Sequence, residues 1–327
     1  MGCNTEIKKS KSASKVEVKK VEGISSFYVD GEKFDLKGVG FNWEYRNDIE
    51  GIKNMGGNAI RTWTTKYADS ILPQAEKHNI KVAMGISIGK ELWGFDYSDS
   101  TAVAQQFKKV KKQVLKYKDH PNLLCWVVGN ELNLLFNEDG VTLKPVDPKV
   151  YDGLAQIVDY IHEVDPNHPV TSTFAGVIND HLQVAMKRCP QLDMVSVQVY
   201  AGLSSVEQAM KDTGIQKPYM VTEFGPRGFW EMPKTPWGRE IEEPSGPKAD
   251  GIIERIDQGL TNNTSGNCLG GFAFVWGQKQ ERTPTWYGMH HKDGSETEII
   301  DRLTHLWTGK YPENRAPRVD ALFLNNK

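Results

Sequence analysis

The feature that most constrains the fold of this chain is an alternation of short apolar segments with segments of helical periodicity. The apolar segments are rich in Val, Ile, Phe and Tyr, and they cover residues 34–42, 58–64, 81–87, 123–131, 169–176, 194–200, 218–225 and 269–277. Most are continuously apolar rather than alternating, which is typical of parallel strands covered on both faces. Between them, apolar residues recur every three to four positions, as in Leu154, Ile157, Val158 and Ile161. This spacing predicts amphipathic helices.

Eight strand–helix units within 327 residues predict an α/β protein with a single (β/α)8 (TIM) barrel. A doubly wound open sheet is the alternative. It is disfavoured because no predicted strand is followed by a GxGxxG or GxxxxGK phosphate-binding loop. Ahead of the first barrel strand, "FYVDGEKF" predicts an N-terminal β-hairpin that turns at Asp30 and Gly31. We expect this hairpin to close the floor of the barrel.

The N-terminal residues 1–20 differ in composition from the rest of the chain. They are rich in Lys and Ser and contain few residues to bury, which predicts a disordered tether ahead of a catalytic domain at 21–327. The first residues, "MGC", resemble the end of a bacterial lipobox. This resemblance implies that Cys3 carries a lipid and that the protein is anchored in the bacterial cell envelope, in the periplasm or at the cell surface. A chance Gly–Cys pair is the alternative.

The net charge and the spacing of the cysteines argue against nucleic-acid binding and against a cysteine metal site. A net charge of −2 gives no electrostatic case for binding nucleic acid, and membrane contact is expected only through the lipid. Cys125, Cys189 and Cys268 lack the spacing of metal ligands and are predicted to be buried free thiols. No cofactor or metal is predicted, and we expect a monomer.

Polar and aromatic residues cluster where the predicted strands end. In a (β/α)8 barrel these C-terminal ends converge on one mouth, where the chemistry takes place. The residues at these ends are Asn42, Glu44, Arg61, Trp63, Asn130, Glu131, Gln198, Tyr200, Glu223, Trp276 and Gln278.

Two carboxylates, Glu131 and Glu223, stand at the ends of the fourth and seventh predicted strands. Hydrolysis of a glycosidic bond needs two carboxyl groups in unequal environments, one protonated and one ionised. Arg61 and Tyr200 are placed to keep Glu223 ionised, and burial would raise the pKa of Glu131. Either glutamate alone could instead belong to a structural ion pair.

Four motifs carry a resemblance to a known group of proteins. "WVVGNELN" resembles the acid/base strand of glycoside hydrolase clan A, and "MVTEFGP" resembles its nucleophile strand. "MGGNAIRTW" and "FVWG" resemble its second and eighth strands. The sequences of these motifs are most similar to the catalytic barrel of family 2 glycoside hydrolases, and the resemblance covers roughly residues 25–310. In the sixth strand the motif departs from the family, because Gln198 stands two residues before Tyr200 where Asn or His is usual.

The resemblance implies roles for several residues. Glu131 would be the general acid/base and Glu223 the nucleophile. Asn130 would hydrogen-bond the 2-hydroxyl of the reacting sugar, and Trp276 would stack on the apolar face of that sugar. Arg61 and Tyr200 would support these four residues.

Long segments without periodicity follow several strands and predict the walls of a cleft. Trp230 and Trp237 lie in the segment after Glu223, and Trp93 follows the third strand. All three are candidate sugar platforms, although a Trp in such a loop could instead pin the loop to the barrel. Gln278 and Glu281 follow the eighth strand as further candidates for the cleft, together with Gln198, Asn42 and Trp63.

These features together predict a retaining β-glycoside hydrolase that acts on a β-linked poly- or oligosaccharide, with a lean towards β-glucan and, within that class, towards β-1,3 linkages. Transglycosylation at the same site would use the same residues. A surface glycan-binding barrel without activity would gain nothing from keeping both glutamates. A metal-dependent hydrolase would need His and Asp at the strand ends.

Overall fold

The computed structural model describes residues 13–140 and 142–318. Nine parallel strand segments form one sheet in the order β8-β7-β6-β5-β4-β12-β11-β10-β9. The segments are β4 (Lys37–Phe41), β5 (Ala59–Arg61), β6 (Lys81–Ile86), β7 (Leu123–Val128), β8 (Val170–Thr171), β9 (Thr173–Ala175), β10 (Val195–Gln198), β11 (Tyr219–Phe224) and β12 (Cys268–Trp276).

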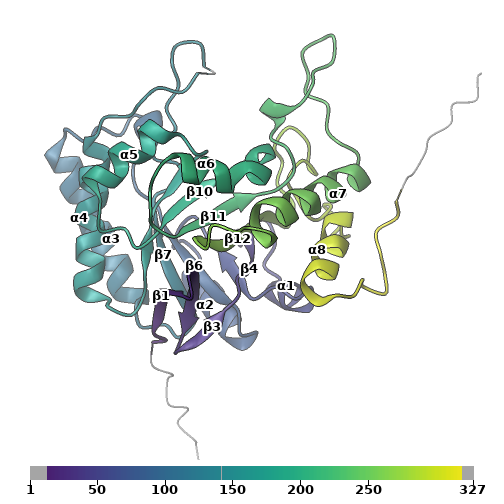
Figure 1. Cartoon of the computed structure of the whole chain (residues 1–327), viewed down its shortest axis with the longest axis horizontal. Helices are drawn as coiled ribbons and strands as arrows, with labels where there is room; N and C mark the ends of the chain where they lie inside the picture. The colour runs from purple at the N-terminus through teal and green to yellow at the C-terminus, as the bar shows by residue number, and fades with distance from the viewer. Residues whose placement is uncertain (1–12, 141, 319–327) are drawn as a thin grey trace, which may run out of the picture.

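The two ends of this strand order belong to one strand. Only Ser172 separates β8 from β9, and β8 pairs with β7 while β9 pairs with β10. The sheet therefore closes on itself with eight strand positions, and the predicted (β/α)8 barrel is confirmed. The helices surround the sheet in Figure 1, where the barrel is seen from the side.

Each barrel strand is followed by a helix. The helices are α1 (Ile49–Asn54), α2 (Ala68–Lys77), α3 (Ser100–Tyr117), α4 (Lys149–Val164), α5 (Asn179–Arg188), α6 (Val206–Asp212), α7 (Ser245–Ile256) and α8 (Glu298–Thr308). Short helical turns lie at η1 (Glu91–Trp93), η2 (Ala201–Ser205), η3 (Phe229–Glu231) and η4 (Asp257–Thr261). In α4 the predicted apolar stripe of Leu154, Ile157 and Ile161 is buried against the sheet. In α3 the Asp99 side chain accepts hydrogen bonds from the first-turn amides of Thr101 and Ala102, which fixes the start of that helix.

The N-terminal part forms a separate antiparallel sheet of β1 (Val16–Val21), β2 (Ile24–Val29) and β3 (Glu32–Phe34). Asp30 and Gly31 form the predicted turn, both with positive φ, at 52° and 89°. The expected tether of residues 1–20 is wrong at its C-terminal end, because residues 16–20 belong to β1. Val16 and Val18 alternate with charged residues there, so one face of β1 has apolar side chains to bury. Residues 1–12, and with them Cys3, lie outside the described residues.

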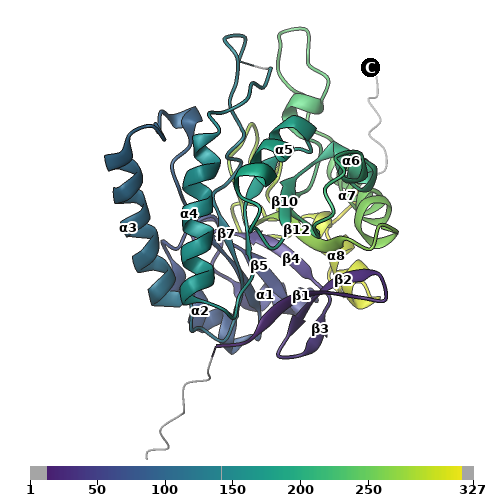
Figure 2. The same ribbon diagram turned by 60° about the vertical axis from the view of Figure 1, so that its left-hand side comes forward.

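This small sheet covers the lower end of the barrel in Figure 2, opposite the long loops. Val16 and Phe27 are buried in one cluster with Ala83, Leu124 and Met220, which come from the barrel strands. The expected closure of the barrel floor by the hairpin is thus confirmed, with β1 as an additional strand.

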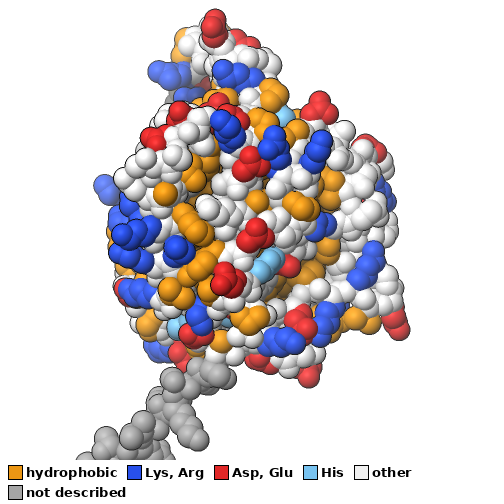
Figure 3. Space-filling model, turned by 90° about the vertical axis from the view of Figure 1, so that its left-hand side faces the viewer, with side chains coloured by type: hydrophobic (Ala, Val, Ile, Leu, Met, Phe, Trp, Pro, Cys, Tyr) orange, Lys and Arg blue, Asp and Glu red, His pale blue; other side chains and the backbone are white. Residues whose placement is uncertain are grey.

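Two long loops rise from the other end of the barrel, after β7 and after β11 (Figure 1). Over the side of the molecule in Figure 3, acidic and basic side chains are interspersed, which fits the net charge of −2. None of the helices in the described part of the chain combines the length and apolar character needed to cross a bilayer.

Candidate active site

A cavity of about 1290 Å³ opens at the C-terminal ends of the strands, between the two long loops. The strand-end residues Asn42, Trp63, Asn130, Glu131, Gln198, Tyr200 and Glu223 line it, as does Trp230 of the loop after β11. Arg61 lies beneath them and is fully buried. With Glu281 after β12, which also lines the cavity, the structure brings together nine of the predicted side chains at the cavity and one directly behind it.

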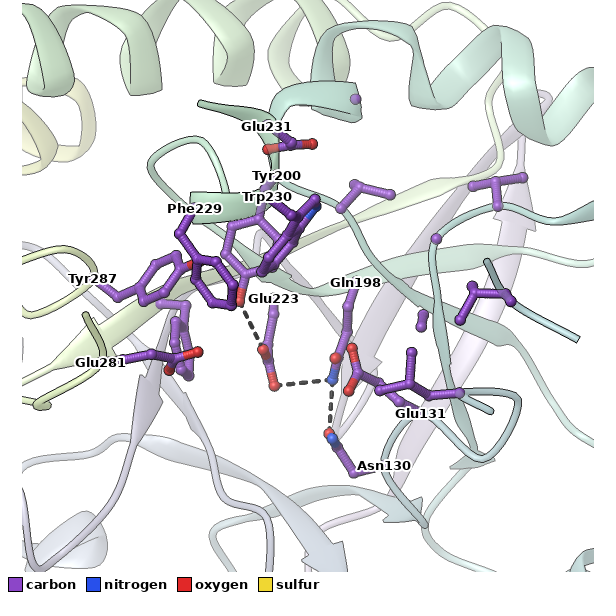
Figure 4. A pocket seen from close by; sticks show the side chains of 18 of the residues that line it. Asn130, Glu131, Gln198, Tyr200, Glu223, Phe229, Trp230, Glu231, Glu281 and Tyr287 are labelled. Carbon is purple, nitrogen blue, oxygen red and sulfur yellow. Dashed lines mark hydrogen bonds between the residues drawn. The ribbon is translucent and has the colours of Figure 1, made fainter. Parts of the chain in front are cut away.

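Glu223 ends β11 and is surrounded by hydrogen-bond donors. Its Oε1 accepts hydrogen bonds from Arg61 Nη1 at 2.8 Å, from Trp63 Nε1 at 2.7 Å and from Gln198 Nε2 at 2.9 Å. Its Oε2 accepts one from the Tyr200 hydroxyl at 3.0 Å, and Figure 4 shows this bond and the Gln198 bond. The carboxyl group is thus held in one orientation, with Oε2 the less occupied oxygen.

Asn130 is oriented by the same residues. Its Oδ1 accepts hydrogen bonds from Arg61 Nη2 at 2.5 Å and from Gln198 Nε2 at 2.7 Å. Because both bonds go to the oxygen, the amide NH2 of Asn130 is left to donate into the cavity. Gln198, which departs from the expected motif, thereby links Asn130 to Glu223.

Glu131 follows directly after Asn130 but has a different environment. Its backbone is left-handed, with φ at 50°, and its amide donates to Thr173 Oγ1 at 3.0 Å. A left-handed conformation is uncommon for a residue with a side chain and is found at functional sites. This turn ends β7 and directs Glu131 into the cavity, where Lys90 Nζ lies 3.9 Å from its Oε2.

Burial is the main influence on both carboxyl groups. It raises the pKa of Glu131, while the positive charges of Lys90, Arg61 and Lys279 lower it. It raises the pKa of Glu223 to about 7, although the Arg61 charge opposes this shift. Arg61 and Tyr200 thus act in the expected direction, because both lower the pKa of Glu223, although desolvation outweighs them.

The two carboxyl groups, Glu131 and Glu223, differ in the hydrogen bonds that they accept, and these bonds influence which of them is protonated. Arg61, the Trp63 indole N–H and the Gln198 NH2 group can only donate, so they favour an ionised Glu223. The carboxyl oxygens of Glu131 face an ammonium group at 3.9 Å, beyond hydrogen-bonding distance. These contacts favour the ionised form of Glu223 more than that of Glu131.

Trp276 does not have its expected place on the sugar. It is almost fully buried, its Nε1 donates to the Asp48 backbone oxygen, and its ring packs edge-on against His290. The pairing of β12 with β4 shifts register between Ala273 and Trp276, so the side-chain alternation breaks there. Phe274 lines the cavity instead, with its ring 5.6 Å from that of Trp63.

Two further predictions fail at the rim. Gln278 does not line the cavity. The chain turns at Gly277, which has φ of 96°, and Lys279 reaches the cavity instead. Trp93 is 76% exposed and lies outside the cavity lining, with one face of its ring covered by Lys90 at 4.8 Å.

Of the two predicted tryptophans in the loop after β11, one lines the cavity and the other does not. Trp230 is 58% exposed, lines the cavity and meets the Tyr200 ring edge-on. Trp237 is exposed and does not line the cavity. Figure 4 shows Tyr200, Phe229, Trp230 and Tyr287 grouped on one side of Glu223.

The sequence analysis overlooked several residues of the cavity, namely Tyr45, Phe229, Phe274, Lys279 and Tyr287. It also overlooked Lys90, which follows the third barrel strand, and Thr173. The sequence could have indicated Lys90 and Tyr45 as residues of the mouth, since both lie within a few residues of a predicted strand end. Nothing in the sequence indicated that Thr173 would bond the Glu131 amide. Among the described residues, no group of His, Cys, Asp and Glu is arranged to hold a metal ion.

Comparison with known proteins gives a family match and several relatives. The model of the TIM barrel domain of glycosyl hydrolases family 2 matches residues 29–231. Pig (Sus scrofa) β-glucuronidase is 22% identical over 287 residues, which span 78% of this chain and 40% of that protein. Human (Homo sapiens) β-glucuronidase is 22% identical over 184 residues, 53% of this chain and 25% of that protein. The chain thus spans less than half the length of these curated relatives.

Solved structures share the fold at lower identity. A β-D-glucuronidase from Dictyoglomus thermophilum superposes with a TM-score of 0.67 at 16% identity, covering 92% of this chain and 54% of its own. A family 2 β-galacturonidase from Eisenbergiella tayi, bound to galacturonate, gives 0.67 at 14% identity, with 91% and 54% covered. At these identities the structures support the fold alone.

Proposed function

Because this chain belongs to family 2 of the glycosyl hydrolases, we propose that it hydrolyses β-glycosidic bonds by double displacement, with Glu131 as acid/base and Glu223 as nucleophile. The observation that carries the proposal is the unequal environment of the two carboxyl groups. Donors surround Glu223, whereas Glu131 accepts no hydrogen bond from them.

In the first step, Oε2 of Glu223 attacks the anomeric carbon, since this oxygen accepts only the Tyr200 hydrogen bond. The bond to the leaving oxygen breaks, and Glu131 gives that oxygen its proton. In the second step, Glu131 takes a proton from water, and the water oxygen displaces Glu223 from the sugar. The Asn130 amide would donate to the 2-hydroxyl of the sugar, a contact that strengthens in the transition state.

For the sugar whose anomeric carbon reacts, we propose a neutral β-linked unit, with the glucose of a β-glucan and β-1,3 linkages as the first candidates. The charged residues that line the cavity support a neutral sugar. They are the five carboxylates Glu131, Glu223, Glu231, Glu240 and Glu281 and the three cations Lys234, Lys279 and Arg282. Lys279 pairs with Glu281, and Glu240 lies 3.7 Å from Lys234 and 3.5 Å from Arg282. No positive charge in the lining is therefore left unpaired to hold a uronate carboxylate.

A uronide is the rival substrate, because the curated relatives are β-glucuronidases. A lipid anchor at Cys3 and a place in the bacterial cell envelope stay part of the proposal, on the N-terminal sequence alone. Detergent-phase partitioning of the protein purified from its native cells, against a Cys3→Ser variant, tests the anchor.

The decisive experiment measures hydrolysis by the wild type, Glu131→Ala and Glu223→Ala. The substrates are nitrophenyl β-glucoside, β-galactoside, β-mannoside and β-glucuronide, together with β-1,3- and β-1,4-linked gluco-oligosaccharides. We expect both variants to lose at least about 10³-fold in kcat/KM. Azide should restore turnover of Glu223→Ala on an activated substrate and give a glycosyl azide of inverted configuration.

Glu44→Ala is the matched control, because Glu44 also follows a barrel strand but is exposed and bonds Lys66 and Tyr67 away from the cavity. Full activity of either Glu131→Ala or Glu223→Ala would exclude the mechanism. Faster hydrolysis of the glucuronide than of every neutral glycoside would exclude the proposed substrate class. Products longer than the oligosaccharide supplied, detected by mass, would assign transglycosylation.

A further inference from the structure

The lining of the single cavity divides by chemistry into two sides, called arms here, because its apolar residues come from the end of β9 and from the segments after β7, β9 and β10. One arm holds the aromatic and charged residues described above. The other, called here the apolar arm, is lined by Leu134, Phe136, Gly140, Leu143, Ala175, Gly176, Val177, Ile178, Val199, Gly202, Ser205, Val206 and Ala209. Of these described residues, only Ser205 has a polar side chain, and none is charged. The apolar lining residues of the cavity are thus separated from the aromatic and charged ones.

The walls of the apolar arm are fixed to each other. Asn133 Nδ2 donates to the Ala175 backbone oxygen at 3.1 Å, and the Ala175 amide donates back to Asn133 Oδ1 at 2.8 Å. These two bonds join the loop after β7 to the segment after β9. Phe136 and Leu143 are bridged within the first wall, and Val206 on α6 is buried in the core. The apolar surface is thus held in place before any ligand binds.

The apolar arm begins at Glu131. The Leu134 amide donates to the Glu131 backbone oxygen at 3.0 Å, and Thr173 of β9 accepts the Glu131 amide. Figure 4 shows Glu131 on the opposite side of Gln198 from Tyr200, Phe229 and Trp230. An acid that protonates the leaving oxygen lies on the side of the leaving group. Given the roles proposed above, the sugar occupies the aromatic arm and the leaving group enters the apolar arm.

A second sugar would fit this arm poorly, because its hydroxyl groups would lose water and find few polar side chains in return. An apolar group would gain from burial in proportion to its area. We propose that the apolar arm is a binding site for an apolar leaving group, so that β-glycosides of alkyl or aromatic alcohols are cleaved more efficiently than a glycan, which would place a sugar in the same arm. This inference rests on the proposed function, and it assigns the chemistry of the leaving group.

The test compares methyl, propyl and hexyl β-glucosides, which differ in leaving-group size but little in reactivity. We expect kcat/KM to rise about twofold to fourfold for each added methylene of the alkyl chain. A β-glucosyl-glucose disaccharide should be a poorer substrate than the hexyl glucoside. Equal rates along the alkyl series, or a disaccharide preferred over the hexyl glucoside, would overturn the inference.

Ile178→Asn and Leu134→Gln should flatten the increase from methyl to hexyl. Ile178 is the N-cap residue of α5 and has no side-chain cap bond, so Asn is well suited to that backbone position. Val184→Asn on the same helix is the matched control, because Val184 is 38% exposed and does not line the cavity. It should keep the full increase along the series. An unchanged increase in both arm variants would also overturn the inference.

Calorimetry with non-hydrolysable methyl and hexyl 1-thio-β-glucosides separates this inference from the proposed function. Burial of the hexyl chain should make the heat capacity change of binding more negative than that of the methyl compound. If the hexyl compound shows this signature while no glycoside is hydrolysed, the site stands and the proposed function fails. If the glycosides are hydrolysed and the two compounds bind alike, the function stands and the site fails.

Discussion

At the scale of single residues, Lys90 shows how the structure adjusts the acid/base. Its side chain is 5% exposed, lies over the Trp93 ring and has its Nζ 3.9 Å from Glu131 Oε2. Arg61, Lys279 and Glu223 also face Glu131, from β5, from the segment after β12 and from β11. A buried positive charge so near the acid stabilises its ionised form.

We expect Lys90→Met to raise the pKa of Glu131, because the ionised form loses a nearby positive charge. The alkaline limb of the pH profile of kcat/KM should therefore move up by about one pH unit. Lys90→Arg keeps the charge and should leave the limb near its wild-type position. A profile of unchanged shape in Lys90→Met, whatever its height, would show that Lys90 does not act on Glu131.

At the scale of secondary structure elements, β12 marks the limit of sequence reasoning. The sequence indicated a strand over residues 269–277, and the structure confirms it. Its position at a strand end and the resemblance of the "FVWG" motif were the basis for placing Trp276 in the mouth. The register shift after Ala273 breaks the side-chain alternation of the strand, and it depends on contacts with β4 that no local pattern reveals.

A pair of variants tests the exchanged roles of Phe274 and Trp276. Phe274→Ala removes a ring from the cavity and should lower kcat/KM by about tenfold or more, mainly through KM. Trp276→Phe should leave KM unchanged and lower the melting temperature, because the hydrogen bond to Asp48 is lost. Kinetics and thermal unfolding of both variants give the answer, and a raised KM in Trp276→Phe alone would contradict it.

The prediction of a disordered tether fails over residues 16–20, which belong to β1, for a different reason. The Lys-rich composition of residues 16–20 hid the alternation of Val16 and Val18, which matters only once the barrel floor offers a surface to cover. Glu131 and Glu223, in contrast, could be predicted to lie in the mouth because strand ends and motifs coincided. The role of Gln198 could not, since a side chain that bonds two neighbours is defined by three strands at once.

At the scale of the whole molecule, the two buried carboxyl groups link folding to pH. Both have their pKa raised by burial, to about 7 for Glu223. A carboxyl group whose pKa is raised on folding stabilises the protein fully below its unfolded pKa. This stability is lost as the pH rises through the folded pKa, since the unfolded chain then holds fewer protons.

We therefore expect Glu131→Gln to gain stability relative to the wild type as the pH rises from 5 to 8, because the variant has no buried charge to form there. Glu44→Gln is the control, since Lys66 and Tyr67 lower the pKa of Glu44, so its contribution is fully present above the ordinary pKa of a glutamate and the difference from the wild type should stay constant over this range. Melting temperatures across this range measure both. A constant difference between Glu131→Gln and the wild type would contradict the expectation.

The place where the described chain enters the barrel has a practical consequence. The Ser14 hydroxyl donates to the backbone oxygens of Pro121 and Leu123 beside the start of β7, at the end of the barrel away from the cavity. A protein immobilised on a bead through its N-terminal side would therefore present its open cleft to the surrounding solution. In a column packed with such beads, the cleft would stay accessible to substrates too large to diffuse between the protein and the bead.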